Sequence, residues 1–227
     1  MKKLTRRKYK VNESYFDRID TPDKAYWLGF IYADGHNSKR EDSITIGLKE
    51  SDASHLYKFR ESIGSDHNIK IYNCTGFNPH NKVAILQIYS KSLSKCLKAK
   101  GCVHNKTDRL EFPDIPKSLC SHFVRGYFDG DGCITYLFDK KGFIRLRFYI
   151  AVNDPFSNQL KELLESILGI RVKLYDQGKI KRLYVFKQKH ILKLLEWIYN
   201  ESTISLDRKN RQSNLLINLY NLDYKKI

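Results

Sequence analysis

The chain has 227 residues, enough for one large domain or for two domains of about 110 residues each. Hydrophobic residues make up 41% and aromatic residues 13%, which supports a buried core and excludes wholesale disorder. No run approaches the roughly 18 apolar residues of a membrane helix, and no apolar segment follows the basic start as in a secretory signal. We therefore expect no membrane partner and an intracellular location, in the cytoplasm or nucleoid, or in an organelle matrix if the gene is organellar.

The charge of the chain favours a polyanionic partner. Lysine and arginine total 41 against 25 acidic residues, a formal net charge of +16. An excess of this size indicates a polyanion more often than a solubility device. A membrane surface would require a basic amphipathic helix, and none is visible beyond the first ten residues. Because the basic residues are instead scattered through strand-like segments, the pattern favours nucleic acid.

The cysteines predict thiols rather than disulfides. Their number is odd and no C-x-x-C pair occurs, which favours reduced, structural thiols in a cytosol-like space. The five are Cys74, Cys96, Cys102, Cys120 and Cys133. A repeated C-x-H, Cys102 with His104 and Cys120 with His122, could in principle supply four zinc ligands, although zinc sites usually have longer and more regular spacings.

An internal repeat organises the predicted elements. Residues 25–35 (AYWLGFIYADG) and 122–132 (HFVRGYFDGDG) share the frame apolar–x–Gly–aromatic–x–x–small–Asp–Gly. In chain order, a strand-like run, an amphipathic helix pattern, two further strand-like runs and a helix pattern follow each copy. In the first half these are 43–49, 51–63, 68–73, 82–89 and 91–100; in the second they are 143–153, 155–168, 171–175, 180–186 and 189–199.

We read each half as helix, two strands, helix, two strands, helix, with only one strand of the first pair assigned a range, and a last helix pattern at 209–221 closes the chain. Residues 176–179 (DQGK) have hairpin-turn chemistry. Residues 111–117 (EFPDIPK) carry two of the five prolines, which predicts a linker between the halves.

The two motif copies carry small residues at helical spacing. Gly29 and Ala33 are four residues apart, and so are Gly126 and Gly130. Residues four apart lie on the same face of a helix, so each helix presents a flat stripe. We expect the two helices to pack backbone to backbone, closer than the usual separation of about 8–10 Å.

An acid ends each motif helix. Gly35 and Gly132 stand where a helix C-terminus favours a left-handed residue, so Asp34 and Asp131 would lie side by side at adjacent C-termini. Two carboxylates about 5 Å apart repel by roughly 3 kcal/mol at an effective dielectric near 20, and the helix dipoles add negative charge. A single Asp-Gly after a helix usually marks only a turn. Two matched copies, each with the small-residue stripe, instead predict a bound cation, for which Mg²⁺ suits the oxygen ligands.

The strand patterns predict polar faces that suit DNA. Arg145, Arg147 and Tyr149 alternate with apolar residues in 143–153, and such a row can contact base edges and phosphates. A solvated polar face is the alternative for any single residue. The candidates are Ser43, Thr45, Lys70, Tyr72, Gln87, Tyr89, Arg145, Arg147, Tyr149, Arg171, Lys173, Tyr175, Arg182 and Tyr184.

WLGFIYADG and VRGYFDGDG resemble the paired motifs of LAGLIDADG homing endonucleases, and the repeat pattern is similar to that fold across nearly the whole chain. The resemblance implies a monomeric, two-motif α+β protein with pseudo-symmetric αββαββα halves at 1–112 and 113–227. Their curved antiparallel sheets would form a saddle over double-stranded DNA. The first copy departs from the family pattern at Tyr32, where an aspartate is common, and at Trp27, where leucine is.

Carried over by position, the resemblance makes Asp34 and Asp131 the catalytic, metal-binding acids, with the carbonyls of Ala33 and Gly130 as further ligands. It implies Mg²⁺ as the cofactor, with Mn²⁺ substituting and Ca²⁺ binding without supporting cleavage. Supporting catalytic roles fall to Lys49, Asn153, Lys106 and Lys209.

The resemblance predicts an endonuclease that cleaves both strands of a long, asymmetric target and leaves 3′ overhangs. Because no protein-splicing blocks are visible in the sequence, we expect a free-standing or intron-encoded enzyme rather than an intein insert. The alternatives are an RNA maturase that binds intron RNA and a non-cleaving DNA-binding protein on the same fold. A nuclease of the HNH type built on His104 and Asn105 lacks a third element at suitable spacing.

Overall fold

The computed structural model describes residues 9–74, 81–103, 110–178 and 180–224. By compactness the chain divides into unit 1, residues 1–18 and 35–104, and unit 2, residues 19–34 and 105–227. Within the described residues, no helix combines the length and the apolar character needed to cross a membrane.

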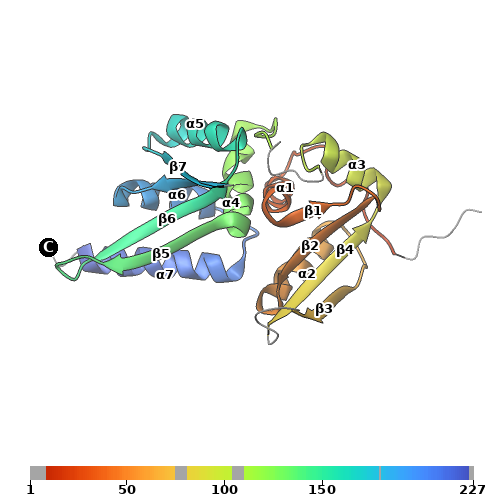
Figure 1. The fold of residues 1–227 in the computed structure, drawn as a ribbon, viewed down its shortest axis with the longest axis horizontal. Helices are drawn as coiled ribbons and strands as arrows, with labels where there is room; N and C mark the ends of the chain where they lie inside the picture. Colours follow the sequence, from red (N-terminus) through yellow and green to blue (C-terminus); the bar gives the residue numbers. More distant parts are fainter. Residues whose placement is uncertain (1–8, 75–80, 104–109, 179, 225–227) are drawn as a thin grey trace, which may run out of the picture. The chain divides into compact units, whose positions relative to one another are not determined.

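The elements of unit 1 are β1 (Gly35–Asn37), β2 (Ser43–Lys49), η1 (Glu50–Asp52), α2 (Ala53–Ser62), β3 (Ile69–Asn73), β4 (Lys82–Tyr89) and α3 (Lys91–Ala99). Its antiparallel sheet, sheet A, has the strand order β1-β2-β4-β3. Ile44, Ile46 and Leu86 are buried on one face of this sheet, and Leu56 and Phe59 of α2 are buried with them. The period-2 alternation of the strands therefore supplies the core of unit 1. Figure 1 shows the strands of sheet A and the helices α2 and α3 beside them.

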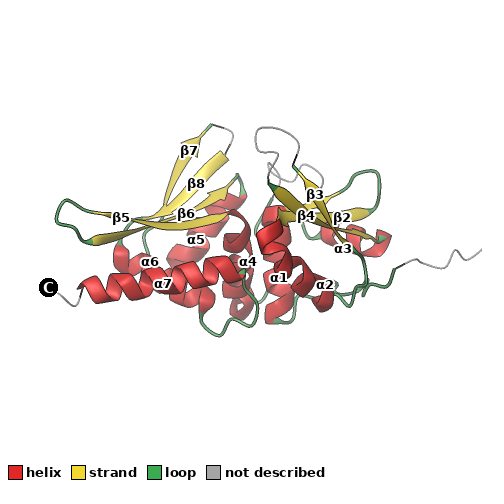
Figure 2. Ribbon diagram, turned by 90° about the horizontal axis from the view of Figure 1, so that it is seen from below, coloured by secondary structure: helices red, strands yellow, loops and turns green. Residues whose placement is uncertain are grey.

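The elements of unit 2 are α1 (Pro22–Asp34), η3 (Lys117–Leu119), α4 (Cys120–Asp131), β5 (Gly132–Phe138), β6 (Ile144–Val152), α5 (Phe156–Leu168), β7 (Lys173–Gln177), β8 (Ile180–Val185), α6 (Gln188–Tyr199) and α7 (Asp207–Tyr224). Its sheet, sheet B, has the order β5-β6-β8-β7, the same topology as sheet A. Figure 2 shows α5, α6 and α7 on one face of sheet B, while the other face carries no helix.

The predicted alternation in the long strand of the second half is confirmed. Ile144, Leu146, Phe148, Ile150 and Val152 are all buried on one face of β6. They meet helices whose apolar faces point inward, as the amphipathic patterns predict. The opposite face of β6 stays accessible.

Most predicted elements are confirmed to within one or two residues. The ranges predicted for β2 and β4 match to the residue, whereas β1 and β5, which begin at the glycine that ends each motif, received no range from the sequence. The predicted hairpin turn is confirmed, since Gln177 pairs with Ile180 across it and Gly178 has a φ of 76°.

Helix α1 belongs to unit 2 because it packs against α4. The contact between these two helices is the most extensive between any two described elements. Grouping by compactness therefore separates α1 from the rest of its own repeat. The predicted division of the sequence into repeats at 1–112 and 113–227 stays a prediction. The predicted linker at 111–117 lies between elements, with η3 beginning at its last residue.

Candidate active site at the ends of α1 and α4

The two motif helices pack through their glycines. A Cβ atom at Gly29 would lie 2.0 Å from the carbonyl oxygen of Phe123, and one at Gly126 would lie 2.0 Å from that of Tyr26. Real Cβ atoms do not approach main-chain oxygen this closely, so only glycine fits either position. Phe123 and Tyr26 also occupy matching places in the two motif copies, so the helix contact is pseudo-symmetric. The predicted backbone-to-backbone packing is confirmed.

The packing brings the two acids to the same end of the helix pair. Asp34 is the last residue of α1 and Asp131 the last residue of α4. A Cβ atom at Gly130 would lie 2.3 Å from the Cβ atom of Ala33 and 3.2 Å from the carboxylate oxygen Oδ2 of Asp34. The carboxylate of Asp34 therefore lies against the backbone of the residue that precedes Asp131. Both acids are half-buried.

The prediction of a left-handed backbone conformation at Gly35 and Gly132 is wrong. Gly132 has a φ of −89° and a ψ of 160°, which is extended backbone, and Gly35 is the first residue of β1. The strands begin without a turn, so no residue with positive φ is needed. Glycine is required at 132 for a different reason, because a Cβ atom there would lie 2.0 Å from the ring of Phe128.

Tyr127 connects both acids and was not identified from the sequence. Burial raises the pKa of its phenol well above the usual value, and the charge of Asp131, a hydrogen bond to Asp131 and the charge of Asp34 raise it further. Its hydroxyl also donates to the carbonyl of Ala151 on β6, at 3.2 Å. Its place four residues before Asp131 on the same helix face was the available signal. A neutral phenol beside two carboxylates acts as a hydrogen-bond donor.

Lys209, predicted as a catalytic residue, is buried against the end of α4. Its ammonium donates to the carbonyls of Phe128 at 2.7 Å, Gly130 at 3.2 Å and Gly132 at 2.5 Å. Burial lowers the pKa of this ammonium, while the charges of Asp129, Asp34 and Asp131 act in the opposite direction. The terminal carbonyls of a helix have no partner within the helix, and a cation there also offsets the dipole. Lys209 therefore caps α4 beside the acids.

Replacing Lys209 with methionine is expected to lower the free energy of unfolding by about 2–3 kcal/mol, because it removes the donor from one buried and two partly buried carbonyls. Urea denaturation of the variant measures this loss. Lys189→Met, at an exposed position on α6, is the matched control and should change little. Unchanged stability in Lys209→Met combined with lost activity would instead assign Lys209 a purely catalytic role.

A buried polar cluster fixes the loop before α7, the helix that carries Lys209. Asp129 accepts hydrogen bonds from the hydroxyls of Tyr26 at 2.7 Å and Tyr199 at 2.8 Å, and from the N–H of Leu206 at 2.7 Å. Arg125 is fully buried and donates to the carbonyls of residues 198 and 204, both at 2.8–2.9 Å. Burial raises the pKa of the Asp129 carboxyl. These contacts join α1, α4 and α6 to the loop before α7.

The oxygen atoms at the ends of α1 and α4 are suitable ligands for a divalent cation. The described residues contain no group of three or more His, Cys, Asp or Glu side chains that could bind a metal. At the helix ends, the candidate side-chain ligands are the carboxylates of Asp34 and Asp131. Hard cations such as Mg²⁺ take carboxylate, carbonyl and water oxygens. The carbonyl of Gly130, a predicted ligand, also accepts from Lys209. The roles predicted for Ala33 and Gly130 stay predictions.

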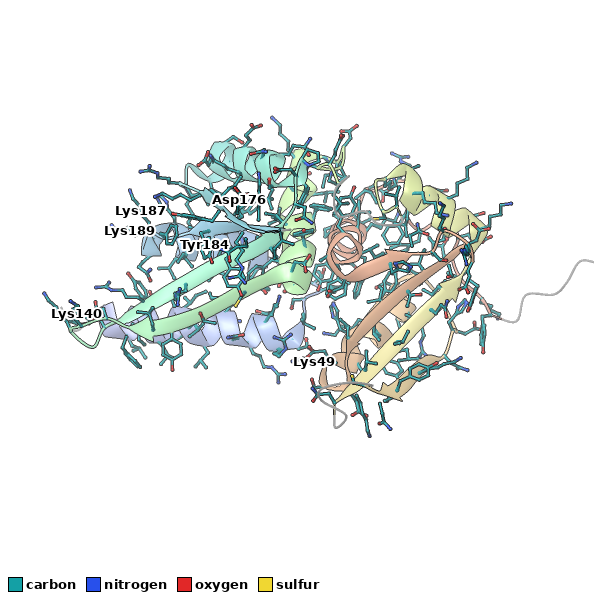
Figure 3. The ribbon with its side chains drawn as sticks, viewed as in Figure 1. Lys49, Lys140, Asp176, Tyr184, Lys187 and Lys189 are labelled. Carbon is teal, nitrogen blue, oxygen red and sulfur yellow. The ribbon has the colours of Figure 1, made fainter. Side chains whose placement is uncertain are left out.

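The roles of the other supporting residues predicted from the sequence stay predictions. Asn153 follows β6 and its carbonyl accepts from the N–H of Ser157 at the start of α5, while Lys49 ends β2 in unit 1, where Figure 3 labels it. Lys106 and His104 lie outside the described residues. The structure therefore brings together Asp34, Asp131 and Lys209.

The predicted DNA-contacting residues of sheet A occupy its open face. Cross-strand pairing places Thr45 opposite Gln87, Ser43 opposite Tyr89, and Tyr72 opposite Val83 on one face. Lys70 is exposed on the same face, opposite Ile85. Unlike the other predicted contacts on this face, Ser43 is fully buried, and its hydroxyl accepts a hydrogen bond from the side chain of Gln87. It supports Gln87 rather than facing solvent.

Sheet B presents its predicted residues in the same way. Arg147 is exposed opposite Thr135, and Arg145 is exposed in part but paired with Asp139 at 2.6 Å, in the turn between β5 and β6. Arg171 is exposed just before β7. The remaining predicted contacts share this face: Tyr149, Lys173, Tyr175, Arg182 and Tyr184.

None of the five cysteines forms a disulfide. Cys102 and Cys120 are buried, and the other three are half-buried. Cys102 belongs to unit 1 and Cys120 to unit 2, and the zinc alternative also needs His104, outside the described residues.

Comparison with known proteins identifies the fold. Residues 118–199 match the family model of the LAGLIDADG-like domain. Among solved structures, the LAGLIDADG meganuclease I-AabMI bound to uncleaved DNA has a TM-score of 0.62 and 17% identity, covering 91% of this chain and 92% of that one. The I-SmaMI homing endonuclease bound to cleaved DNA has a TM-score of 0.62 and 16% identity, covering 91% and 90%.

The N-terminal LAGLIDADG domain of DUF199/WhiA is also similar, with a TM-score of 0.53 and 18% identity, covering 83% of this chain and 89% of that one. No curated protein sequence matches the chain. The protein thus has the two-repeat α+β fold of the LAGLIDADG meganucleases. Residues 118–199 in its second half match the LAGLIDADG-like domain, and the resemblance to LAGLIDADG homing endonucleases is confirmed.

Proposed function

We propose that the protein is a site-specific endonuclease that makes divalent-metal-dependent double-strand breaks in DNA. Its target would be a long, asymmetric duplex site, cut to leave 3′ overhangs by a monomer. The observation that carries the proposal is the pair of acids at the ends of two helices in backbone contact, with Asp34 against Gly130 and both acids around Tyr127.

In this proposal Asp34 and Asp131 hold Mg²⁺, with the carbonyl of Ala33 beside them. A bound divalent cation would activate water and stabilise charge on the phosphodiester. Tyr127 and Lys209 orient the site, because one donates to Asp131 and the other fastens the last turn of α4. The net charge of +16 and the helix-free sheet faces support a duplex DNA partner.

The test is cleavage of a duplex library or of the DNA that flanks the gene, with Mg²⁺, with Mn²⁺, with Ca²⁺ and with a chelator. We expect double-strand products with 3′ overhangs in Mg²⁺ and Mn²⁺, and binding alone in Ca²⁺. Protection of a specific site without any cleavage in Mg²⁺ would contradict the proposal.

That contrary result would support the second candidate, a DNA-binding protein that does not cleave. One observation favours it: the ammonium of Lys209 already donates to the carbonyl of Gly130, so α4 carries a cation at its end without a metal.

Replacing Arg147 with alanine is expected to weaken binding to the target duplex by roughly 1–3 kcal/mol, because Arg147 projects from the open face of β6. Arg145→Ala is the matched control on the same strand. Its guanidinium is paired with the carboxylate of Asp139, with Nε at 2.8 Å and Nη2 at 2.6 Å from that group, so its loss should cost less. Titration of labelled duplex by fluorescence anisotropy measures both. An equal loss in the two variants would contradict this ranking.

A further inference from the structure

The outer edge of sheet B is a strand paired on one side. By the strand order of the sheet, β5 has β6 on one side and no strand of the described residues on the other. At the turn after β5, the N–H of Asp139 donates to the carbonyl of Phe143 at 2.9 Å. Because main-chain groups alternate in direction along a strand, those of Tyr136 and Phe138 point away from β6. β5 therefore presents hydrogen-bonding groups along an open edge.

Helix α7 runs along this edge, on the helix-covered side of the sheet. The side-chain amide of Gln212 donates to the carbonyl of Ile134 at 2.9 Å, and Figures 1 and 2 both show α7 following β5 toward the turn between β5 and β6. Leu215 follows Gln212 by three residues and Leu222 follows Leu215 by seven, so both leucines lie on the β5 side of the helix. Both are exposed.

Two aromatic rings of β5 lie on the same side of the sheet. Tyr136 pairs with Leu146 and Phe138 with Ile144, and both partners are buried on the helix-covered face, so the two rings also face that way. The rings meet edge to face with centroids 5.6 Å apart. Four residues, each 46–62% exposed, make up what we name the β5–α7 edge: Tyr136, Phe138, Leu215 and Leu222.

The β5–α7 edge is separate from the surface proposed to contact DNA. Arg147 lies on the helix-free face of sheet B opposite Thr135, and side chains alternate along β5, so Tyr136 faces the other way. Soluble proteins rarely leave large apolar side chains beside an open strand edge, because such an edge is a template for pairing with another chain. The combination indicates a surface that binds protein.

Positive charges flank the β5–α7 edge at both ends. Arg211 is exposed one helical turn before the first of the two leucines. Lys140 and Lys141 are exposed in the turn after β5, where Figure 3 labels Lys140. Asp139, the acid of that turn, is paired with Arg145. An apolar segment with acidic ends complements this surface, whereas a second copy of the chain, with its net charge of +16, would be repelled.

We propose that the β5–α7 edge binds an extended segment of a partner protein, which pairs with β5 as an added strand. The segment has an apolar row that packs on the rings and leucines of the edge, and acidic residues at its ends. Main-chain hydrogen bonds to β5 supply affinity, and the alternate side chains supply specificity. DNA cleavage does not use this surface, so the binding goes beyond the proposed function and does not depend on it.

The test uses a synthetic segment of the stated chemistry. The probe is a fluorescein-labelled peptide in which Val-Thr-Ile-Thr-Val stands between two pairs of glutamates. Anisotropy titrations with the full chain at about 0.3 M salt suppress binding that rests on charge alone. One control peptide replaces the glutamates with lysines, and another carries N-methyl groups on its main chain, which removes the donors for strand pairing. Phe138→Ser and Leu222→Ser change the edge, and Ile167→Ser, at an exposed apolar position on α5, is the matched control.

Phe138→Ser and Leu222→Ser are each expected to raise the Kd for the acidic peptide by about tenfold, the effect of removing one central interface side chain, while Ile167→Ser stays near wild type. The lysine and N-methyl peptides should bind about tenfold more weakly than the acidic peptide, or worse. Excess duplex DNA should not displace the acidic peptide, because the helix-free face lies on the other side of the sheet.

Displacement of the peptide by duplex DNA would assign it to the basic helix-free face and overturn the proposal. No binding of the acidic peptide, or an unchanged Kd in both edge variants, would overturn it as well. Leu222→Ser decides the question if Phe138→Ser lowers the melting temperature. Sedimentation of the wild type as a dimer that Phe138→Ser dissociates would instead assign the edge to a second copy of the chain.

Discussion

Asp131→Asn is expected to lower the rate of double-strand cleavage by about 10²–10³-fold or more, the range for removing one group that stabilises transition-state charge. Asparagine has the same shape but carries no charge, so the pair at the ends of α1 and α4 would no longer hold the proposed divalent cation. Asp34→Asn should have the same effect, because its carboxylate lies on the other side of the same helix contact. Plasmid nicking and linearisation assays in Mg²⁺ measure both variants.

The same substitution should leave the fold intact or strengthen it. Removing a negative charge from a helix C-terminus relieves an unfavourable dipole interaction of roughly 0.3–1 kcal/mol, and repulsion from Asp34 falls as well. Urea denaturation should therefore show an unchanged or higher free energy of unfolding. The control is Asp176→Asn, an exposed acid at the end of β7. Wild-type cleavage by either helix-end variant would contradict the metal-binding role.

Gly126→Ala is expected to lower the free energy of unfolding by about 3 kcal/mol or more, at the upper end of overpacking costs. The new Cβ atom would lie 2.0 Å from the carbonyl oxygen of Tyr26 and 2.8 Å from the nitrogen of Phe30. Both are main-chain atoms, so the clash is relieved only by separating α1 from α4. The gain in helix propensity, about 1 kcal/mol for alanine over glycine, is too small to compensate.

The control for this experiment is Gly47→Ala on β2. A Cβ atom there would lie 3.7 Å from a methyl carbon of Val83, which is ordinary contact, so the change should stay within about 0.5 kcal/mol. Equilibrium denaturation of the two variants decides the point. If Gly126→Ala is as stable as wild type, the helices do not meet backbone to backbone. Separation of α1 from α4 should also abolish cleavage, because Asp34 would leave Asp131.

The sequence alone determined the repeat, the order of elements and the pair of acids. These follow from local signals: period-2 alternation defined β2 and β4 to the residue, and a Gly–x–x–x–small spacing identified the contact face of α1 and α4. Duplication strengthened each signal, because a pattern that occurs once can be an ordinary turn, whereas two copies in one frame indicate a shared role.

The tertiary structure alone decided how that pair is surrounded. Lys209 was predicted as a catalytic side chain, a role that stays a prediction, and the structure shows its ammonium at the end of α4, where it donates to carbonyls 77 to 81 residues earlier in the chain. Gly132 proved to be extended, since the ring of Phe128 rather than a turn requires glycine there. The rings of Phe186 and Tyr184 stack with centroids 5.4 Å apart, a contact that the sequence did not predict. Periodicity in the sequence predicts which side of a helix or strand is buried. It does not predict which residues from distant parts of the chain contact that side.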